Sequence, residues 1–503
     1  MKHVLATLAG LIVVLAAAPV IAAPSDPASA TKPNILLVLT DDIGWGDYGC
    51  YDPKGKIPSP NIDRLAREGM RFTNAHTPAG LCAPTRYTML TGNYPWRGRS
   101  PGGTWGYNVP SQLRPGQRTV ADLLRGAGYR TAMYGKAGTG GFWQAAKGPK
   151  PHAPLAPIEW GFDYSFLIPR GHQSPPHAFF ENGVEVPMQW DTSLVGQRLL
   201  DKANRFLDDH LAANKSEGRE RPFYMHVCTD GSHSPYVPAP FLGGVPLKGA
   251  TKMTAHTDMV YETDILAGQL VEALQRRGLL DNTLLVITSD NGGLPYERNY
   301  GHDAVAGLRG RKGFIFEGGH RVPFIVRWPG KVQAGSVRNQ VIGTHDLVAT
   351  ALELAGVKAG DKQCLDAVSL LPVLLGKQDD AQPIRESLLV QSSPGRDAND
   401  DGGFTGGDVE IDEESGVKAS HKADKKPRLA KNAASDHMAH AILAGEWKLL
   451  IDMANRPAAL YHLSDDPSEQ KNLISDPAQA ERVKHMNETY RTIRASRRST
   501  PIP

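Results

Sequence analysis

The chain has 503 residues, of which 40% are hydrophobic and 22% are charged, and its formal net charge at pH 7 is +3. This length exceeds what one compact core usually takes, so we expect two domains, or one large domain with an appendage. The near-neutral charge argues against a nucleic-acid or membrane-surface specialist, although a local basic pocket could still hold an anion.

The N-terminus has the pattern of a secretory signal peptide. An apolar run covers Val4–Ala18, and small residues follow it. The run is too short and wrongly flanked for a stable membrane anchor, so we expect a signal peptide over residues 1–22 and a linker over residues 23–32. The protein is then exported, to the periplasm or the medium. Only four cysteines are present, which excludes a disulfide scaffold.

Short apolar runs alternate with helical patterns along residues 33–383. Continuous runs of this kind are typical of strands buried on both faces of a parallel sheet. Strands are predicted at Asn34–Thr40, Tyr129–Tyr134, Phe223–Cys228, Thr283–Ser289 and Val322–Trp328. Helices are predicted from Pro60 to Gly69, from Thr119 to Gly128, and at Ser193–Ala213, Asp258–Arg277 and His345–Ala355. This alternation predicts an α/β fold with a large, mostly parallel or mixed sheet flanked by helices.

The pattern changes in residues 384–503, which we interpret as a small C-terminal subdomain. Residues 392–434 are rich in Gly, Asp, Glu and Lys, and we interpret them as a charged, mobile insertion. Beyond it, Ala441–Ile451 and Leu460–Leu463 predict strands of a small antiparallel sheet. Gln479–Arg494 predicts a last helix.

The stretch Cys82-Ala83-Pro84-Thr85-Arg86 has the pattern of an anion cradle. A helix that begins near Pro84 places Cys82 at its N-terminal end, where free N–H groups and the helix dipole favour anions. Arg86 lies one turn further on and can face the same ligand. The alternative is a buried cysteine followed by an ordinary surface arginine.

Two acidic pairs, Asp41-Asp42 and Asp290-Asn291, each follow a predicted buried strand. Open α/β sheets bind ligands just past the carboxyl ends of their strands. Three carboxylates and one amide oxygen suit a hard cation such as Ca²⁺ or Mg²⁺, and the absence of histidine from both pairs argues against zinc. The alternative is that these residues only form turns and helix caps.

The motif Cys82–Arg86, followed by Thr91-Gly92, resembles the signature of the formylglycine-dependent sulfatases of the arylsulfatase type. The usual fourth residue of the motif is Ser, so Thr85 is a mild departure. The resemblance extends over roughly Lys32–Leu473, apart from the insertion. It implies an alkaline-phosphatase-like fold and a formylglycine-generating enzyme that oxidises Cys82 to formylglycine, whose hydrate is the nucleophile.

The same resemblance implies roles for the residues around this nucleophile. One divalent ion, usually calcium, would be bound by Asp41, Asp42, Asp290, Asn291 and the modified residue 82. Lys312 lies in Leu308–Pro323, which resembles the second long signature of the family, and would bind the sulfate group. Lys136 matches a second sulfate-binding lysine. His233, in a His-x-Pro pattern, would protonate or hydrogen-bond the leaving oxygen.

Gly138 departs from the family pattern. In the family, a histidine stands two residues after the lysine that Lys136 matches, and it is implicated in breaking down the sulfated intermediate. His302, His172 and His177 are candidates for its replacement; otherwise the enzyme is slow.

These observations predict an exported sulfatase that acts on aryl or carbohydrate sulfate monoesters. A sulfated polysaccharide is the preferred substrate, and a sulfated small molecule is the other. Two alternatives stay open. The first is a hydrolase of phosphate or phosphonate esters on the same fold. The second, prompted by Gly138, is a catalytically silent ester-binding homologue.

Overall fold

The computed structural model describes residues 32–99, 110–141, 160–169, 171, 177–187, 189–392 and 438–500. The predicted signal peptide, all of the predicted linker but Lys32, and all of the predicted insertion but Ser392 lie outside these residues. Among the described residues, no helix is both long enough and apolar enough to cross a bilayer.

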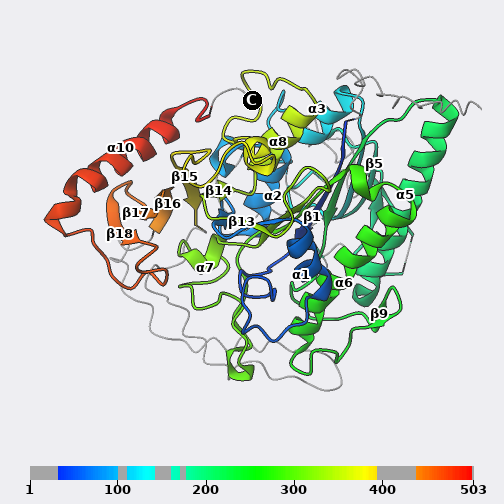
Figure 1. The fold of residues 1–503 in the computed structure, drawn as a ribbon, viewed down its shortest axis with the longest axis horizontal. Coiled ribbons are helices and arrows are strands. Elements are labelled where there is room, and N and C mark those ends of the chain that lie inside the picture. Colours follow the sequence, from blue (N-terminus) through cyan, green and yellow to red (C-terminus); the bar gives the residue numbers. More distant parts are fainter. Residues whose placement is uncertain are drawn as a thin grey trace, which may run out of the picture. The chain divides into compact units, whose positions relative to one another are not determined.

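A ten-stranded sheet includes the two strands that the predicted metal-binding acids directly follow (Figure 1). Its order is β13-β2-β12-β11-β1-β8-β4-β5-β6-β7. The strands are β1 Asn34–Thr40, β2 Met70–Phe72, β4 Arg130–Lys136, β5 Tyr164–Ile168, β6 Phe180–Glu181, β7 Val184–Glu185, β8 Phe223–Cys228, β11 Thr283–Ser289, β12 Phe324–Arg327 and β13 Ser336–Arg338. The neighbours β11, β1, β8, β4 and β5 are parallel, and β12 is antiparallel to β11. The predicted large, mixed and mostly parallel sheet is confirmed.

Helices cover both faces of this sheet, as the continuous apolar runs require. Successive side chains of β1 point to opposite faces, so Leu37 packs into one hydrophobic cluster and Leu36 into the other. The first cluster includes α2 Cys82–Thr91, α3 Val120–Gly126 and α8 Asp346–Leu354. The second includes α1 Pro60–Glu68, α5 Val195–Glu217 and α6 Ala255–Arg276, and α5 lies beside α6 in Figure 1. Every residue of β1 and β11 is buried.

Short elements connect these layers. Two small pairs of strands form outside the main sheet, β3 Ala75–His76 with β14 Ile342–Gly343 and β9 Phe241–Leu242 with β10 Val245–Pro246. The shortest helices are α7 Glu317–His320 and α9 Leu371–Leu374. Single 3₁₀ turns lie at Pro95–Arg97, Thr192–Leu194, Leu280–Asn282, Arg298–Tyr300 and Pro477–Gln479.

The C-terminal part forms a separate antiparallel sheet, as predicted, with α10 Ala480–Ala495 packed on it (Figure 1). Its strands, in order, are β15 Leu388–Gln391, β16 Met438–Ala444, β17 Trp447–Asp452 and β18 Pro457–His462. The single strand predicted over Ala441–Ile451 is wrong, because this stretch crosses a hairpin. Gly445, at φ +56°, makes the turn between β16 and β17.

Gly135 offers a test of how tightly the central strands are packed. It lies on β4 at φ +79°, and a Cβ there would be 1.8 Å from the Cys228 carbonyl oxygen of β8. Gly128 has a similar φ of +95° but no atom within 4 Å of its would-be Cβ. G128A should cost only the left-handed backbone strain, about 1–2 kcal/mol. G135A must also displace a strand, so we expect a loss above about 4 kcal/mol by urea denaturation. Equal losses would contradict this packing.

Candidate active site

The carboxyl ends of β1, β11 and β4 bring five of the predicted residues to one place. β1 and β11 are parallel with Thr40 opposite Ser289, so the pairs Asp41-Asp42 and Asp290-Asn291 leave the sheet side by side. The backbone of Asp290 donates to the Thr40 carbonyl at 3.1 Å, which fixes this register. Lys136 ends β4 on the far side of β8. All five side chains are buried.

Cys82 is the first residue of α2, two residues before the predicted start at Pro84. Its Sγ and one carboxylate oxygen each of Asp41 and Asp290 lie within 4.8 Å of one another. All four cysteines of the chain are free. Burial raises the pKa of the Cys82 thiol, although Lys136 and Lys312 act in the opposite sense. The thiol is therefore protonated at neutral pH and is a poor nucleophile as it stands.

Three cations balance the three carboxylates. Arg86 donates from Nε to Asp290 Oδ2 at 2.9 Å, with Nη2 2.6 Å from the same oxygen. Lys136 Nζ is 2.5 Å from Asp41 Oδ2, and Lys312 Nζ is 2.6 Å from the Asp42 carboxylate. Arg86 also donates to the Lys136 carbonyl at 2.9 Å, which joins α2 to the end of β4. The structure thus brings the predicted sulfate-binding cations and metal-binding acids into one network.

The acids of this network differ in their protonation. Burial and the charge of Asp41 raise the pKa of Asp290 to about 7, although Arg86 opposes the shift. Burial acts the same way on Asp41, but Lys136 and Arg86 outweigh it and hold the pKa of Asp41 well below its usual range. Like charges at this distance cannot both ionise without compensation, so a further cation would favour the ionised form of Asp290.

The residues present fit one hard cation. Asp41 Oδ1 and Asn291 Oδ1 are buried, and neither has a hydrogen-bond partner among the described residues. Asn291 Nδ2 donates to Asp42 Oδ1 at 2.9 Å, and this orients the amide so that its oxygen remains available. Buried oxygens without partners are costly unless a cation or a donor meets them. The donor set is rich in oxygen, as Ca²⁺ and Mg²⁺ prefer.

His233 lies on the loop after β8, next to this network. Ser232, at φ +72°, donates from Oγ to the Asp41 carbonyl at 2.8 Å and ties the loop to β1. His233 Nδ1 donates to the Ser234 carbonyl at 2.8 Å. Burial, then the charges of Lys136 and Lys312, lower the pKa of His233 from 6.5 to about 4. The imidazole is neutral in the free protein at pH 7, and a bound anion would favour its protonated form.

Two of the three candidates for the histidine missing at Gly138 make contacts elsewhere. His302 Nε2 is 2.9 Å from Asp47 Oδ1, and its Nδ1 accepts from the Lys56 backbone at 3.2 Å. His177 stacks on Trp190 with ring centroids 5.4 Å apart. None of these contacts is with a residue of the predicted sulfate site, and His172 lies outside the described residues.

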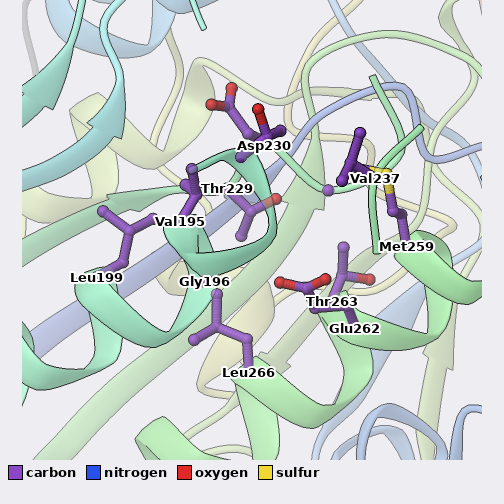
Figure 2. A pocket seen from close by; sticks show the side chains of 12 residues that line it. Val195, Gly196, Leu199, Thr229, Asp230, Val237, Met259, Glu262, Thr263 and Leu266 are labelled. Carbon is purple, nitrogen blue, oxygen red and sulfur yellow. The ribbon is translucent and has the colours of Figure 1, made fainter. Parts of the chain in front are cut away.

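A small pocket lies between α5, α6 and the start of the loop that follows β8 (Figure 2). Thr229 and Asp230 line it from the loop, and α5 and α6 close the other sides. Gly231 lets the loop approach α6, because a Cβ there would be 2.5 Å from Thr263 Cγ2. None of the predicted site residues is among those that line the pocket.

Two residues that the sequence analysis did not single out complete the surroundings of the site. Lys448 of β17 and Glu469, which follows β18, are fully buried and form an ion pair at 2.8 Å, although their side chains are charged. Both contact Glu317, which lies in the same signature segment as Lys312. A lysine directly before the apolar run Leu449–Ile451 was a signal available in the sequence.

Comparison with known proteins identifies the class of this site. A family model described as Sulfatase matches residues 33–357. The chain is 30% identical to an N-acetylgalactosamine-6-O-sulfatase of Bacteroides thetaiotaomicron, over 69% of this chain and 78% of that protein. It is 31% identical to human arylsulfatase A, over 90% and 85% of the two chains.

A solved structure from work on the metabolism of multiple glycosaminoglycans by Bacteroides thetaiotaomicron has the same fold. It superposes with a TM-score of 0.72 at 25% identity, and the match covers 93% of this chain and 100% of that one. The fold and the site thus define a hydrolase of the alkaline-phosphatase-like superfamily. The chain belongs to the sulfatase family and is a sulfuric ester hydrolase.

The contribution of the Lys312 charge to the low pKa of His233 can be tested with K312M. Removing one of the two lysine charges should raise the pKa of His233 from about 4 towards 6.5, followed by NMR of ¹³C-labelled histidine. The pKa of His233 is lower in the folded protein than in the unfolded chain, so protonation of His233 favours unfolding. The free energy of unfolding is therefore unaffected by His233 above pH 6.5 and falls as the pH drops from 6.5 to about 4. K331M, at an exposed lysine, is the control. An unchanged His233 pKa in K312M would show that the Lys312 charge does not contribute to the shift.

G138H tests whether the family histidine can simply be restored. Gly138 has φ +70°, and a Cβ there would be 2.9 Å from Arg86 Cδ. The new side chain should push Arg86 away from Asp290, so we expect kcat/KM to fall by about tenfold or more. G116H has the same backbone strain, at φ +81°, but meets nothing within 4 Å and should keep its activity. A rise in turnover for G138H would show that Arg86 can move aside without loss.

Proposed function

We propose that this sulfatase hydrolyses carbohydrate sulfate monoesters through a formylglycine made from Cys82, with one bound Ca²⁺, or Mg²⁺ in its place. The observation that carries the proposal is the position of Cys82 Sγ within 4.8 Å of oxygens of Asp41 and Asp290, at a helix N-terminus. A protonated thiol beside two carboxylates is a poor nucleophile. An aldehyde hydrate at the same place offers two hydroxyl groups on one carbon.

The cation would be held by Asp41, Asp42, Asp290, Asn291 and the modified residue 82. When bound, it supplies positive charge that polarises the sulfate group and lowers the pKa of a hydroxyl at residue 82. The three acids offset the three cations when all are ionised, and Asp290, with a pKa of about 7, is partly protonated at neutral pH. A divalent ion adds positive charge, which makes the network attractive to an anionic ester.

Arg86, Lys136 and Lys312 would bind the sulfate oxygens. A sulfate monoester resists attack mainly because its anionic oxygens repel nucleophiles, and these three side chains offset that charge. Asp290 would accept the proton of the attacking hydroxyl. The attack forms the S–O bond and breaks the bond to the leaving alcohol. The second hydroxyl on the same carbon then allows the sulfate to leave residue 82. A plain Ser or Cys has no second hydroxyl and could not expel the sulfate in this way.

His233 would protonate or hydrogen-bond the leaving oxygen. Its Nδ1 donates to the Ser234 carbonyl, and its Nε2 would face the leaving oxygen. Its low pKa in the free protein follows first from burial and then from two lysine charges, which a bound sulfate ester would offset. Gly138 leaves the second half of the reaction without the family histidine, and we propose that this half is the slower one.

A sulfated carbohydrate is the substrate class that the relatives support. One of them is named for a sulfate ester on an amino sugar, and a structural neighbour comes from glycosaminoglycan metabolism. Such substrates lie outside the cell, which agrees with the proposed signal peptide and with a maturation step by a formylglycine-generating enzyme before export.

The first test is the mass of the peptide that contains Cys82, from protein made in a host with the maturation enzyme. Conversion of the thiol to the aldehyde lowers the mass by about 18 daltons, whereas ordinary cysteine oxidation adds oxygen and raises it. The C82A variant, which cannot be converted, is the control and should have no measurable turnover. An unmodified thiol in active protein would refute this mechanism.

The second test separates the alternatives that share the fold. Matched sulfate, phosphate and phosphonate esters of one phenol, each with and without a chelator, give six kcat/KM values. We expect the sulfate ester to be preferred and chelation to abolish its turnover, because the cation supplies the charge that polarises the sulfate group. Preference for the phosphate or phosphonate ester would favour the alternative hydrolase, and no turnover of any ester would favour the silent homologue.

A further inference from the structure

Lys312 lies at the tip of a loop that touches two parts of the site. Its backbone N–H donates to the Gly293 carbonyl at 3.2 Å, just after the acidic pair that follows β11. The next residue, Gly313, donates to the Gly80 carbonyl at 2.6 Å, two residues before Cys82. The Lys312 side chain meets Asp42 of β1. The position of the loop therefore determines where the Lys312 ammonium lies relative to Asp42 and Cys82.

The loop has no room to shift. A Cβ on Gly292 would be 1.9 Å from the Gly318 oxygen, and one on Gly319 would be 2.1 Å from the Phe314 oxygen. A Cβ on Gly80 would likewise be 2.8 Å from the Phe314 oxygen. Backbones this close behave as one packed unit, so a displacement at the base of the loop reaches its tip.

One residue of the C-terminal subdomain holds both ends of this loop. At the first end, Arg309 Nη1 donates to the Glu469 carbonyl at 2.8 Å. At the second end, the Glu317 backbone N–H donates to Glu469 Oε2 at 2.7 Å. The ends are also joined directly, because the Gly318 N–H donates to the Arg309 carbonyl at 2.7 Å.

Lys448 holds Glu469 in place. Its Nζ is 2.8 Å from Glu469 Oε1 and 3.0 Å from Glu317 Oε1, and it also lies 3.0 Å from His320 Nε2. His76, Glu317 and His320 each offer one possible metal-ligand atom, and these three atoms lie within 4.8 Å of one another. Because the Lys448 ammonium already contacts two of these residues, we assign it as the cation of the cluster. The charged groups are fully buried, so each depends on its partner.

We infer that Glu469, fixed by Lys448, is a positioning residue for Lys312. It holds the base of the Arg309–Glu317 loop at both ends, and the tip of that loop carries the sulfate-binding lysine. The inference rests on the proposed role of Lys312. It gives the C-terminal sheet a part in catalysis, although none of its residues needs to touch the substrate.

E469Q is the sharpest variant. Glu469 uses one oxygen for the Glu317 N–H and the other for Lys448, whereas glutamine has only one oxygen to offer. One of the two contacts must therefore be lost without a change of shape. R309Q removes the side-chain contact at the other end and serves as the second variant if E469Q does not fold. Y490F is the matched control, because the Tyr490 hydroxyl bonds to Asn455 within the same subdomain but away from the loop.

The experiment measures kcat/KM on an aryl sulfate and the rise in melting temperature caused by inorganic sulfate. We expect E469Q to lower kcat/KM by about tenfold to a hundredfold and to reduce the sulfate-induced rise, since a small misplacement of a binding group is costly. R309Q should act in the same direction. Y490F should lower the melting temperature without changing either measurement.

A double variant separates positioning from general stability. In K312A, added E469Q should cost no further activity or sulfate response, while its effect on the melting temperature remains. A full additional loss in the K312A background would overturn the inference. If K312A alone leaves kcat/KM and the sulfate response unchanged, the proposed sulfate-binding role of Lys312 fails instead.

Discussion

The repulsion between Asp41, Asp42 and Asp290 is the constraint on which the site depends. Parallel strands β1 and β11 end side by side and bring these buried carboxylates together. Each carboxylate contacts a cation from a different part of the chain. Lys136 of β4 pairs with Asp41, and Arg86 of α2 pairs with Asp290. Lys312 of the Arg309–Glu317 loop, here called the signature loop, pairs with Asp42. Breaking one buried pair leaves an uncompensated charge, so segments far apart in sequence are fixed relative to one another.

Local sequence was enough to predict the parts of this arrangement that are themselves local. The apolar run of β1 is buried at every position, and the acids that follow it lie at the sheet edge, as an open α/β sheet requires. The helix of Cys82 was also predicted, apart from its first two residues. The hairpin at Gly445 was missed because apolar residues on both sides of the turn continue one pattern.

Long-range pairing could not be predicted in this way. The sequence shows that residues 448 and 469 are a lysine and a glutamate. Only the structure shows that both are buried and that both contact Glu317 of α7. The same holds for Gly138. The sequence shows a missing histidine, whereas the structure shows that Arg86 Cδ lies 2.9 Å from where a Cβ would stand. Contacts between residues that are far apart in the sequence produce no periodic pattern from which they could be predicted.

The charge balance also explains why such a site can fold before it is able to react. Each carboxylate already has a cation, and the Cys82 thiol is protonated, so the unmodified chain needs no ligand to neutralise its core. In the mechanism we propose, oxidation of residue 82 supplies the nucleophile and a divalent ion makes the network electropositive. Reactivity then depends on two later additions to a framework whose geometry the strands, α2 and the signature loop have already set.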